Sequence, residues 1–154
     1  MRSRQATLRV LVDTSFILPS LGIDVGREVL DGLKKLADVE AEIYYSRFSI
    51  LESLWVVARL SKSPAFDADR FELGLRSVLE SGRYKRVEES TETFSEALKL
   101  HTLGHKDMID NLLYASSTVL SLKLCTMDTE LKGFIRDREL DDTLILPDEI
   151  ASFR

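Results

Sequence analysis

The chain has 154 residues, 44% of them hydrophobic and 31% charged, and this balance predicts one globular domain over residues 1–154 with a buried core. The net charge of -5 means that the chain as a whole does not attract polyanions, so any contact with nucleic acid must be local. A single cysteine excludes an internal disulfide, and no apolar run approaches the ~20 residues of a membrane helix. These features predict a cytoplasmic protein without a membrane partner.

The predicted elements alternate between strands and helices. The apolar run 8–12 predicts a first strand, and a short helix over 14–18 is expected to follow it. Asp24 is expected to cap a longer helix, and a short strand at 43–45 comes next. Ser46 follows that strand directly and is a plausible N-cap for another helix.

The second half of the chain continues this alternation. Further helices are expected after the caps Asp67, Thr91 and Asp107 and near 129–136, and further strands at 84–87, 122–127 and 143–146. Strands that alternate with helices predict an α/β fold with a central parallel sheet flanked by helices.

Two apolar runs far apart in the chain each end at an aspartate. Asp13 follows the first predicted strand, and Asp128 follows the strand at 122–127. The carboxyl ends of parallel strands meet at one edge of a sheet, so both side chains are expected to face the same crevice. Each aspartate could equally be an ordinary helix N-cap, since a helix is predicted directly after it.

Two further acids lie on predicted helices between these aspartates. Glu52 precedes an apolar stretch that leaves little solvent around its carboxylate. A capping box with Ser49, or a salt bridge to Arg59 or Lys62, is the alternative to a functional role. The second acid is Asp110, which lies one turn inside its helix.

The helix of Asp110 carries a polar stripe. Asp107, Asp110, Asn111 and Tyr114 fall at spacings that place them on one face, opposite the apolar positions. Asp107 is the better N-cap and Asp110 the better metal ligand, because Asp110 is aimed from the wall of the helix.

Four carboxylates at one place repel one another unless a cation holds them, so the sequence predicts a divalent metal site. Oxygen ligands favour Mg²⁺ or Mn²⁺, and one or two ions could serve. His101 and His105 are four residues apart, but Gly104 lies between them and no cysteine or third histidine completes a zinc site. Both histidines are therefore expected to be dispensable. The chain also lacks a glycine-rich phosphate-binding loop.

The order of these acids resembles the PIN domain family, whose best-known members are metal-dependent ribonucleases that include toxins of the VapBC type. The matching segments span almost the whole chain: Val12-Asp13-Thr14-Ser15, Ser49-Ile50-Leu51-Glu52, residues 110–116 and Thr126-Met127-Asp128. Each motif is short, so the specificity comes from the set and its order.

The resemblance implies a sheet of about five parallel strands and an endoribonuclease that hydrolyses RNA phosphodiester bonds with Mg²⁺ or Mn²⁺. It implies that Asp13, Glu52, Asp110 and Asp128 are the catalytic and metal-binding residues, with Asp107 as a candidate fifth ligand. It also implies a homodimer and, for a toxin, an antitoxin protein as partner.

Two other functions are also compatible with the sequence. The chain could be a PIN-like binding or assembly module with weak catalysis, although it retains all four acids. A haloacid-dehalogenase-type phosphatase also has an aspartate after its first strand, but the second aspartate of that family, two positions later, is replaced by Ser15.

Overall fold

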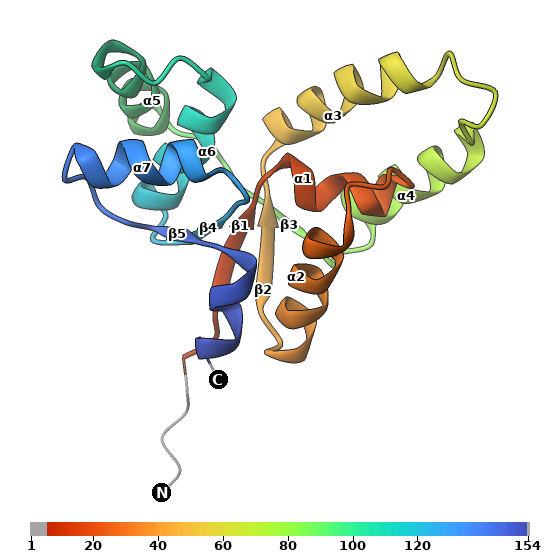
Figure 1. Ribbon diagram of the computed structural model, residues 1–154, viewed down its shortest axis with the longest axis horizontal. Coiled ribbons are helices and arrows are strands. Elements are labelled where there is room, and N and C mark those ends of the chain that lie inside the picture. The colour runs from red at the N-terminus through yellow and green to blue at the C-terminus, as the bar shows by residue number, and fades with distance from the viewer. Residues whose placement is uncertain (1–5, 154) are drawn as a thin grey trace, which may run out of the picture.

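A parallel sheet of five strands forms the centre of the computed structural model, which describes residues 6–153 (Figure 1). The strands are β1 (Arg9–Val12), β2 (Glu42–Tyr45), β3 (Lys85–Arg86), β4 (Lys123–Cys125) and β5 (Leu144–Ile145). Their order is β3-β2-β1-β4-β5, and every neighbouring pair is parallel. The predicted α/β fold with a parallel sheet is confirmed. The ends of the predicted domain, at residues 1–5 and 154, lie outside the described part.

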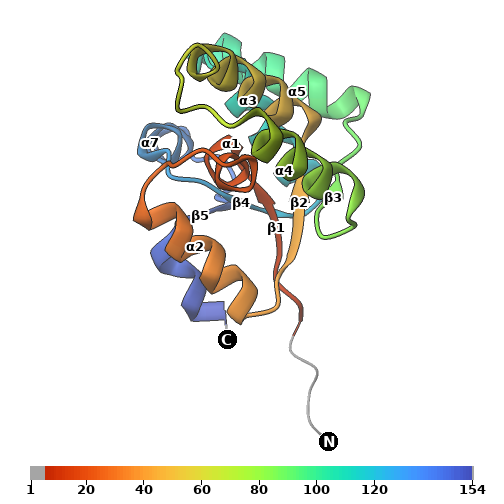
Figure 2. The same ribbon diagram turned by 90° about the vertical axis from the view of Figure 1, so that its right-hand side faces the viewer.

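Helices cover both faces of this sheet (Figures 1 and 2). They are α1 (Thr14–Ile17), α2 (Arg27–Asp38), α3 (Arg47–Leu60), α4 (Ala68–Glu80), α5 (Thr91–Leu103), α6 (Met108–Val119) and α7 (Thr129–Asp137), with the 3-10 helices η1 (Leu18–Leu21) and η2 (Pro147–Phe153). Alternate residues of β1 enter different cores, because successive side chains of a strand point to opposite faces. Val10 packs with Phe16 of α1 and Leu36 of α2, whereas Leu11 packs with Leu113 of α6 and Ile135 of α7.

The order in which the chain adds strands to the sheet reverses at β1. The chain runs from β1 outward to β2 and β3, and then returns to place β4 and β5 on the other side of β1. The carboxyl ends of β1 and β4 therefore lie side by side at the point where the strand order reverses. Open α/β sheets bind their ligands in the crevice outside this point.

Short polar side chains begin most of the helices, as the sequence predicts. Ser46 accepts a hydrogen bond from the Phe48 amide, and Asp67 accepts one from the Arg70 amide. Asp24 is not the N-cap of α2, which begins at Arg27 after Gly26, because the Asp24 carboxylate accepts a hydrogen bond from the Gly26 amide in a local turn. Likewise the N-cap of α5 is Ser90, which forms a capping box with Thr93, so Thr91 is the first helical residue.

The polar stripe predicted on helix α6 is wrong for two of its four residues. Asn111 and Tyr114 are 0% and 5% exposed, so they do not lie on a solvated face with Asp107 and Asp110. All residues from 111 to 117 are buried. The helix packs on α5 as well as on the sheet, and a helix covered on two sides buries residues all round.

None of the helices within residues 6–153 has both the length and the apolar character that a membrane span requires.

Candidate metal centre

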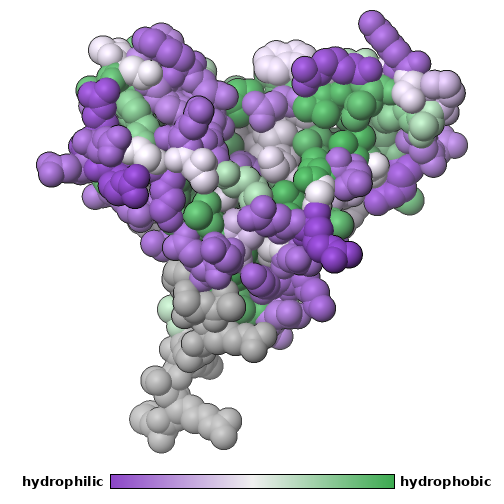
Figure 3. Space-filling model, viewed as in Figure 1, coloured by the Kyte–Doolittle hydropathy of each residue, from purple (hydrophilic) through white to green (hydrophobic). Residues whose placement is uncertain are grey.

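The four acids singled out in the sequence line one cavity of about 250 Å³ at the carboxyl edge of the sheet. The cavity is lined by Asp13, Thr14, Ser15, Glu52, Asp110, Met127 and Asp128. It lies where α3 on one side faces α6 and α7 on the other, and the space-filling view shows the molecule hollowed between these parts (Figures 1 and 3). The carboxyl ends of β1 and β4 and two helices, α3 and α6, thus bring together four carboxylates that are at least 18 residues apart in the sequence.

Asp13 is held at two points. Its Oδ1 accepts a hydrogen bond of 3.0 Å from the Ser15 amide, which caps α1, and its Oδ2 accepts one of 2.7 Å from the Thr126 hydroxyl. Burial raises the pKa of Asp13 to about 6, against the opposing effect of these hydrogen bonds, and the charge of Glu52 adds a smaller upward contribution. The sequence left open whether Asp13 caps a helix or lines a functional site, and in the structure its carboxylate does both.

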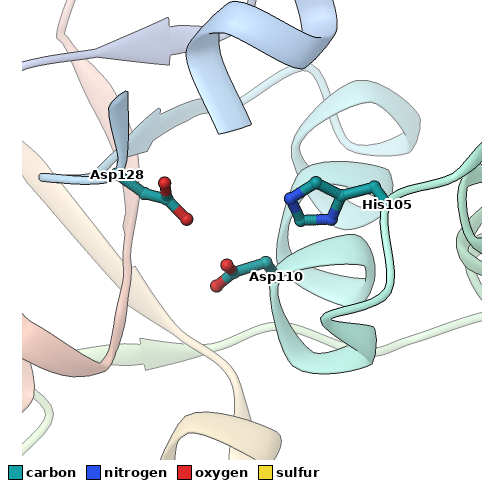
Figure 4. A group of neighbouring side chains, drawn as sticks. All are labelled: His105, Asp110 and Asp128. Carbon is teal, nitrogen blue, oxygen red and sulfur yellow. The ribbon is translucent and has the colours of Figure 1, made fainter. Parts of the chain in front are cut away.

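Asp128 and Asp110 face each other across the cavity (Figure 4). Asp128 caps α7 by accepting a hydrogen bond of 3.0 Å from the Leu131 amide, while Thr126 Oγ1 accepts one from the Asp128 amide. Burial raises the pKa of Asp110 to about 8, and a hydrogen bond with Asp128 and the charge of Asp107 add to this rise. In the absence of a cation, a proton between the two carboxylates relieves their repulsion.

Glu52 lies on α3 without the structural partners weighed for it. The N-cap of α3 is Ser46, so Ser49 and Glu52 do not form a capping box. No ion pair joins Glu52 to Arg59 or Lys62 among residues 6–153. Its carboxylate lines the cavity instead.

Asp107 caps α6 from outside the cavity. Its carboxylate accepts a hydrogen bond of 3.1 Å from the Asp110 amide, and it is absent from the residues that line the cavity. Its charge nevertheless acts on Asp110. Asp107 is therefore at the margin of the site.

Replacing Asp107 by alanine is expected to lower the free energy of unfolding by about 0.5–2 kcal/mol, because α6 loses its cap. Urea denaturation measures this loss. Asp107→Asn keeps a capping oxygen and should be close to wild type in stability. Both variants should keep the rise in melting temperature that Mn²⁺ gives the wild type; loss of that response in both would make Asp107 a metal ligand.

His105 also lies at this site, which the sequence analysis missed. One ligand atom each of His105, Asp110 and Asp128 lie within 4.8 Å of one another. The four-residue spacing drew attention to His101 as its partner, yet His101 is not in this group. The signal available in the sequence was the position of His105 two residues before the cap of the Asp110 helix, where it enters the site from the α5–α6 connection.

The donor set fits a divalent metal ion. Several carboxylate oxygens converge on one cavity, and the upward pKa shifts of Asp13 and Asp110 are those of carboxylates that lack a positive partner. Hard divalent ions take oxygen ligands of this kind and offset their repulsion. The residues that could hold such an ion are Asp13, Glu52, Asp110, Asp128 and His105.

The fold and the site together define a class: a parallel α/β protein with an acidic cavity at the point where its strand order reverses. The sequence profile of the PIN domain matches residues 10–136, and the chain belongs to the PIN domain family, a family of nucleases. This assignment confirms the resemblance seen in the sequence motifs and leaves the phosphatase alternative without support. No curated protein sequence matches the chain significantly.

Solved structures share the fold at low sequence identity. A toxin-antitoxin complex from Klebsiella pneumoniae aligns with a TM-score of 0.56 and 14% identity, covering 90% of this chain and 97% of the other. VapBC2 from Rickettsia felis, bound to a DNA fragment from the promoter, aligns with a TM-score of 0.61, 17% identity and the same coverage. FitAcB from Neisseria gonorrhoeae gives 0.54 and 18%, again covering 90% and 97%.

Proposed function

We propose that this chain, as one nuclease domain, is an endoribonuclease that hydrolyses RNA phosphodiester bonds with Mg²⁺ or Mn²⁺, and that it is the toxin of a toxin-antitoxin pair. The observation that carries the proposal is the convergence of Asp13, Glu52, Asp110 and Asp128 on one cavity. Membership of a nuclease family and the likeness to toxin-antitoxin complexes support it.

The proposed roles follow from how the side chains are held. Asp13, Asp110 and Asp128 bind the ion, and Glu52 completes the acidic wall of the cavity from α3. A divalent ion there supplies a more acidic water and neutralises negative charge on the attacked phosphate. Asp13 and Asp128 are fixed by hydrogen bonds from Ser15, Thr126 and Leu131, so they need little rearrangement. Without a cation, these carboxylates would repel the phosphates of RNA.

The direct test is incubation of the purified protein with single-stranded RNA and with DNA of the same sequence. RNA should be cut with Mg²⁺ or Mn²⁺ and left intact with chelator, and water attack in line should leave 5′-phosphate ends. An intact RNA pool under all metal conditions would favour the alternative, a binding or assembly module. DNA cleavage at an equal rate would contradict the assignment of RNA as substrate.

The proposals of a homodimer and of an antitoxin partner rest on exposed apolar side chains at the surface. Large apolar side chains are exposed on α3 and α5, and they meet where Phe48 contacts Phe94 edge-on, with ring centroids 6.0 Å apart. Figure 3 shows apolar side chains gathered over α3. Contiguous exposed apolar surface of this kind marks protein interfaces. We infer that a second copy of the chain covers the α3–α5 surface, and that an antitoxin protein binds and inhibits the enzyme, as the complexes of the structural neighbours suggest.

The substitution Leu98→Glu is expected to break the proposed homodimer. Leu98 on α5 is 61% exposed, and a charge there would be buried without a partner in the interface. Leu73 is 66% exposed on α4, a helix that lies far from α5 in Figure 1, so Leu73→Glu is the matched control. Light scattering should give the mass of two chains for wild type and Leu73→Glu, and of one chain for Leu98→Glu. A monomeric wild type would refute the dimer.

A further inference from the structure

The shared family motifs do not include His105, and it is not among the residues that line the cavity, yet a ring nitrogen of its side chain lies within 4.8 Å of carboxylate oxygens of Asp110 and Asp128. We propose that His105 is a nitrogen ligand of the divalent ion, bound through Nε2 beside the carboxylates of Asp110 and Asp128. This inference rests on the proposed function, because it presupposes a metal ion in the cavity. It makes the centre a mixed nitrogen and oxygen site instead of a purely acidic one.

The first argument for this ligand is the position of the three side chains relative to one another. His105 comes from the connection before α6, Asp110 from the first turn of α6, and Asp128 from the end of β4. Their ligand atoms lie within 4.8 Å of one another, which a small shift of side chains would bring around one ion. Figure 4 shows the imidazole edge of His105 turned towards the two carboxylates.

The second step is that the imidazole is oriented by buried contacts. Asn111 Nδ2 donates a hydrogen bond of 2.7 Å to the backbone carbonyl of His105, which turns Asn111 Oδ1 towards the ring. That oxygen lies 2.7 Å from His105 Nδ1 and can only accept, so Nδ1 carries the proton. Phe134 of α7 packs against the same ring with centroids 5.2 Å apart.

These contacts leave Nε2 with its lone pair. Metal-binding histidines characteristically donate their other ring N–H to an oxygen acceptor, which fixes the tautomer and the ring orientation. Asn111 supplies that acceptor here, and it is fully buried. A buried asparagine whose two polar atoms both serve one histidine is the arrangement expected around a ligand.

A nitrogen ligand changes which ions the site prefers. Both Mg²⁺ and Mn²⁺ favour oxygen ligands, but Mn²⁺ is a transition metal that accepts an imidazole nitrogen more readily, whereas Mg²⁺ dehydrates reluctantly and retains its waters. Loss of His105 should therefore weaken Mn²⁺ binding on the order of tenfold and Mg²⁺ binding much less. Isothermal titration calorimetry on wild type and His105→Gln measures both affinities. His101→Gln is the matched control, since it changes the one other histidine of the chain.

Pulsed electron paramagnetic resonance on the Mn²⁺-loaded protein gives a readout that does not depend on activity. Wild type should show the ¹⁴N coupling of a directly bound imidazole, His101→Gln should keep it and His105→Gln should lose it. The wild-type spectrum remains decisive even if His105→Gln folds poorly, because the chain has only two histidines.

The other outcomes separate this inference from the proposed function. Tight Mn²⁺ binding that is lost in Asp110→Asn, with no ¹⁴N coupling in wild type, would overturn the role of His105 and leave the acidic metal site standing. A coupling that disappears in His101→Gln instead would also overturn it. A folded wild type that binds neither Mn²⁺ nor Mg²⁺ would overturn the metal centre itself.

Discussion

Replacing Asp110 by asparagine should reduce RNA cleavage by at least about 10²–10³-fold, the size of effect seen when one preorganised electrostatic group is removed from an active site. The substitution keeps the size of the side chain and removes its charge from a cavity whose proposed task is to hold a divalent ion. The measurement is the single-turnover rate on a labelled RNA with saturating Mn²⁺. Asp13→Asn should lose activity to a similar extent, and it keeps an oxygen that can cap α1.

The control is an acid outside the cavity. Asp31 is exposed on α2, so Asp31→Asn removes one charge from the molecule and none from the site. It should cleave at the wild-type rate. A rate for Asp110→Asn within a few fold of wild type, with the variant folded, would show that this acid is not part of the catalytic site.

The melting temperature of the metal-free protein should stay the same or rise when Asp110 becomes asparagine. Folding holds Asp110 near the charges of Asp13, Asp107 and Asp128, a repulsion that the unfolded chain does not have. Asp110 caps no helix itself, since Asp107 supplies the cap of α6, so the substitution removes repulsion and leaves the cap in place. A clear fall in melting temperature would show that the Asp110 carboxylate is structural.

Mn²⁺ should stabilise the wild type much more than Asp110→Asn. An ion that binds only the folded state at 100 times its dissociation constant adds about 2.7 kcal/mol, which is several degrees for a chain of this size. The wild type should gain this and Asp110→Asn should gain little. Differential scanning fluorimetry with and without Mn²⁺ measures both. A wild type indifferent to Mn²⁺ would contradict a metal centre.

The same repulsion gives the metal-free protein a pH dependence. The pKa of Asp110 is raised to about 8 and that of Asp13 to about 6 in the folded state, both above their unfolded values near 4. From about pH 4, near the unfolded pKa values, to about pH 8, the folded pKa of Asp110, the folded state binds more protons than the unfolded state. The free energy of unfolding therefore falls as the pH rises through this range. The melting temperature should therefore drop from pH 5 to pH 8, by less in Asp110→Asn. Saturating Mn²⁺ should flatten this slope.

The alternation of apolar runs with capped helices determined the secondary structure and the class of fold. Asp67 and Asp107 cap the helices expected of them, and each of the five predicted strands is present in the sheet. The errors are local. Asp24 and Thr91 are near the starts of their helices without being the caps, because the competing turn at Gly26 and the capping box of Ser90 decide where each helix begins.

The position of the acidic cavity also followed from the sequence. An aspartate directly after a buried parallel strand must lie at the carboxyl edge of the sheet, whatever the details of packing. That argument placed Asp13 and Asp128 correctly, and the motif order added Glu52 and Asp110. It could not separate a capping role from a place in the cavity, and the structure shows that Asp13 and Asp128 have both.

Only the tertiary structure decided what surrounds the acids. Spacing along a helix tells which residues share a face, but burial depends on which distant elements cover that face. Asn111 and Tyr114 share a face with the acids by spacing, yet α5 and the sheet enclose α6 and bury both. His105 likewise gains its place beside Asp110 and Asp128 because the connection from α5 to α6 turns it towards the end of β4, a contact between segments more than twenty residues apart that no local pattern encodes.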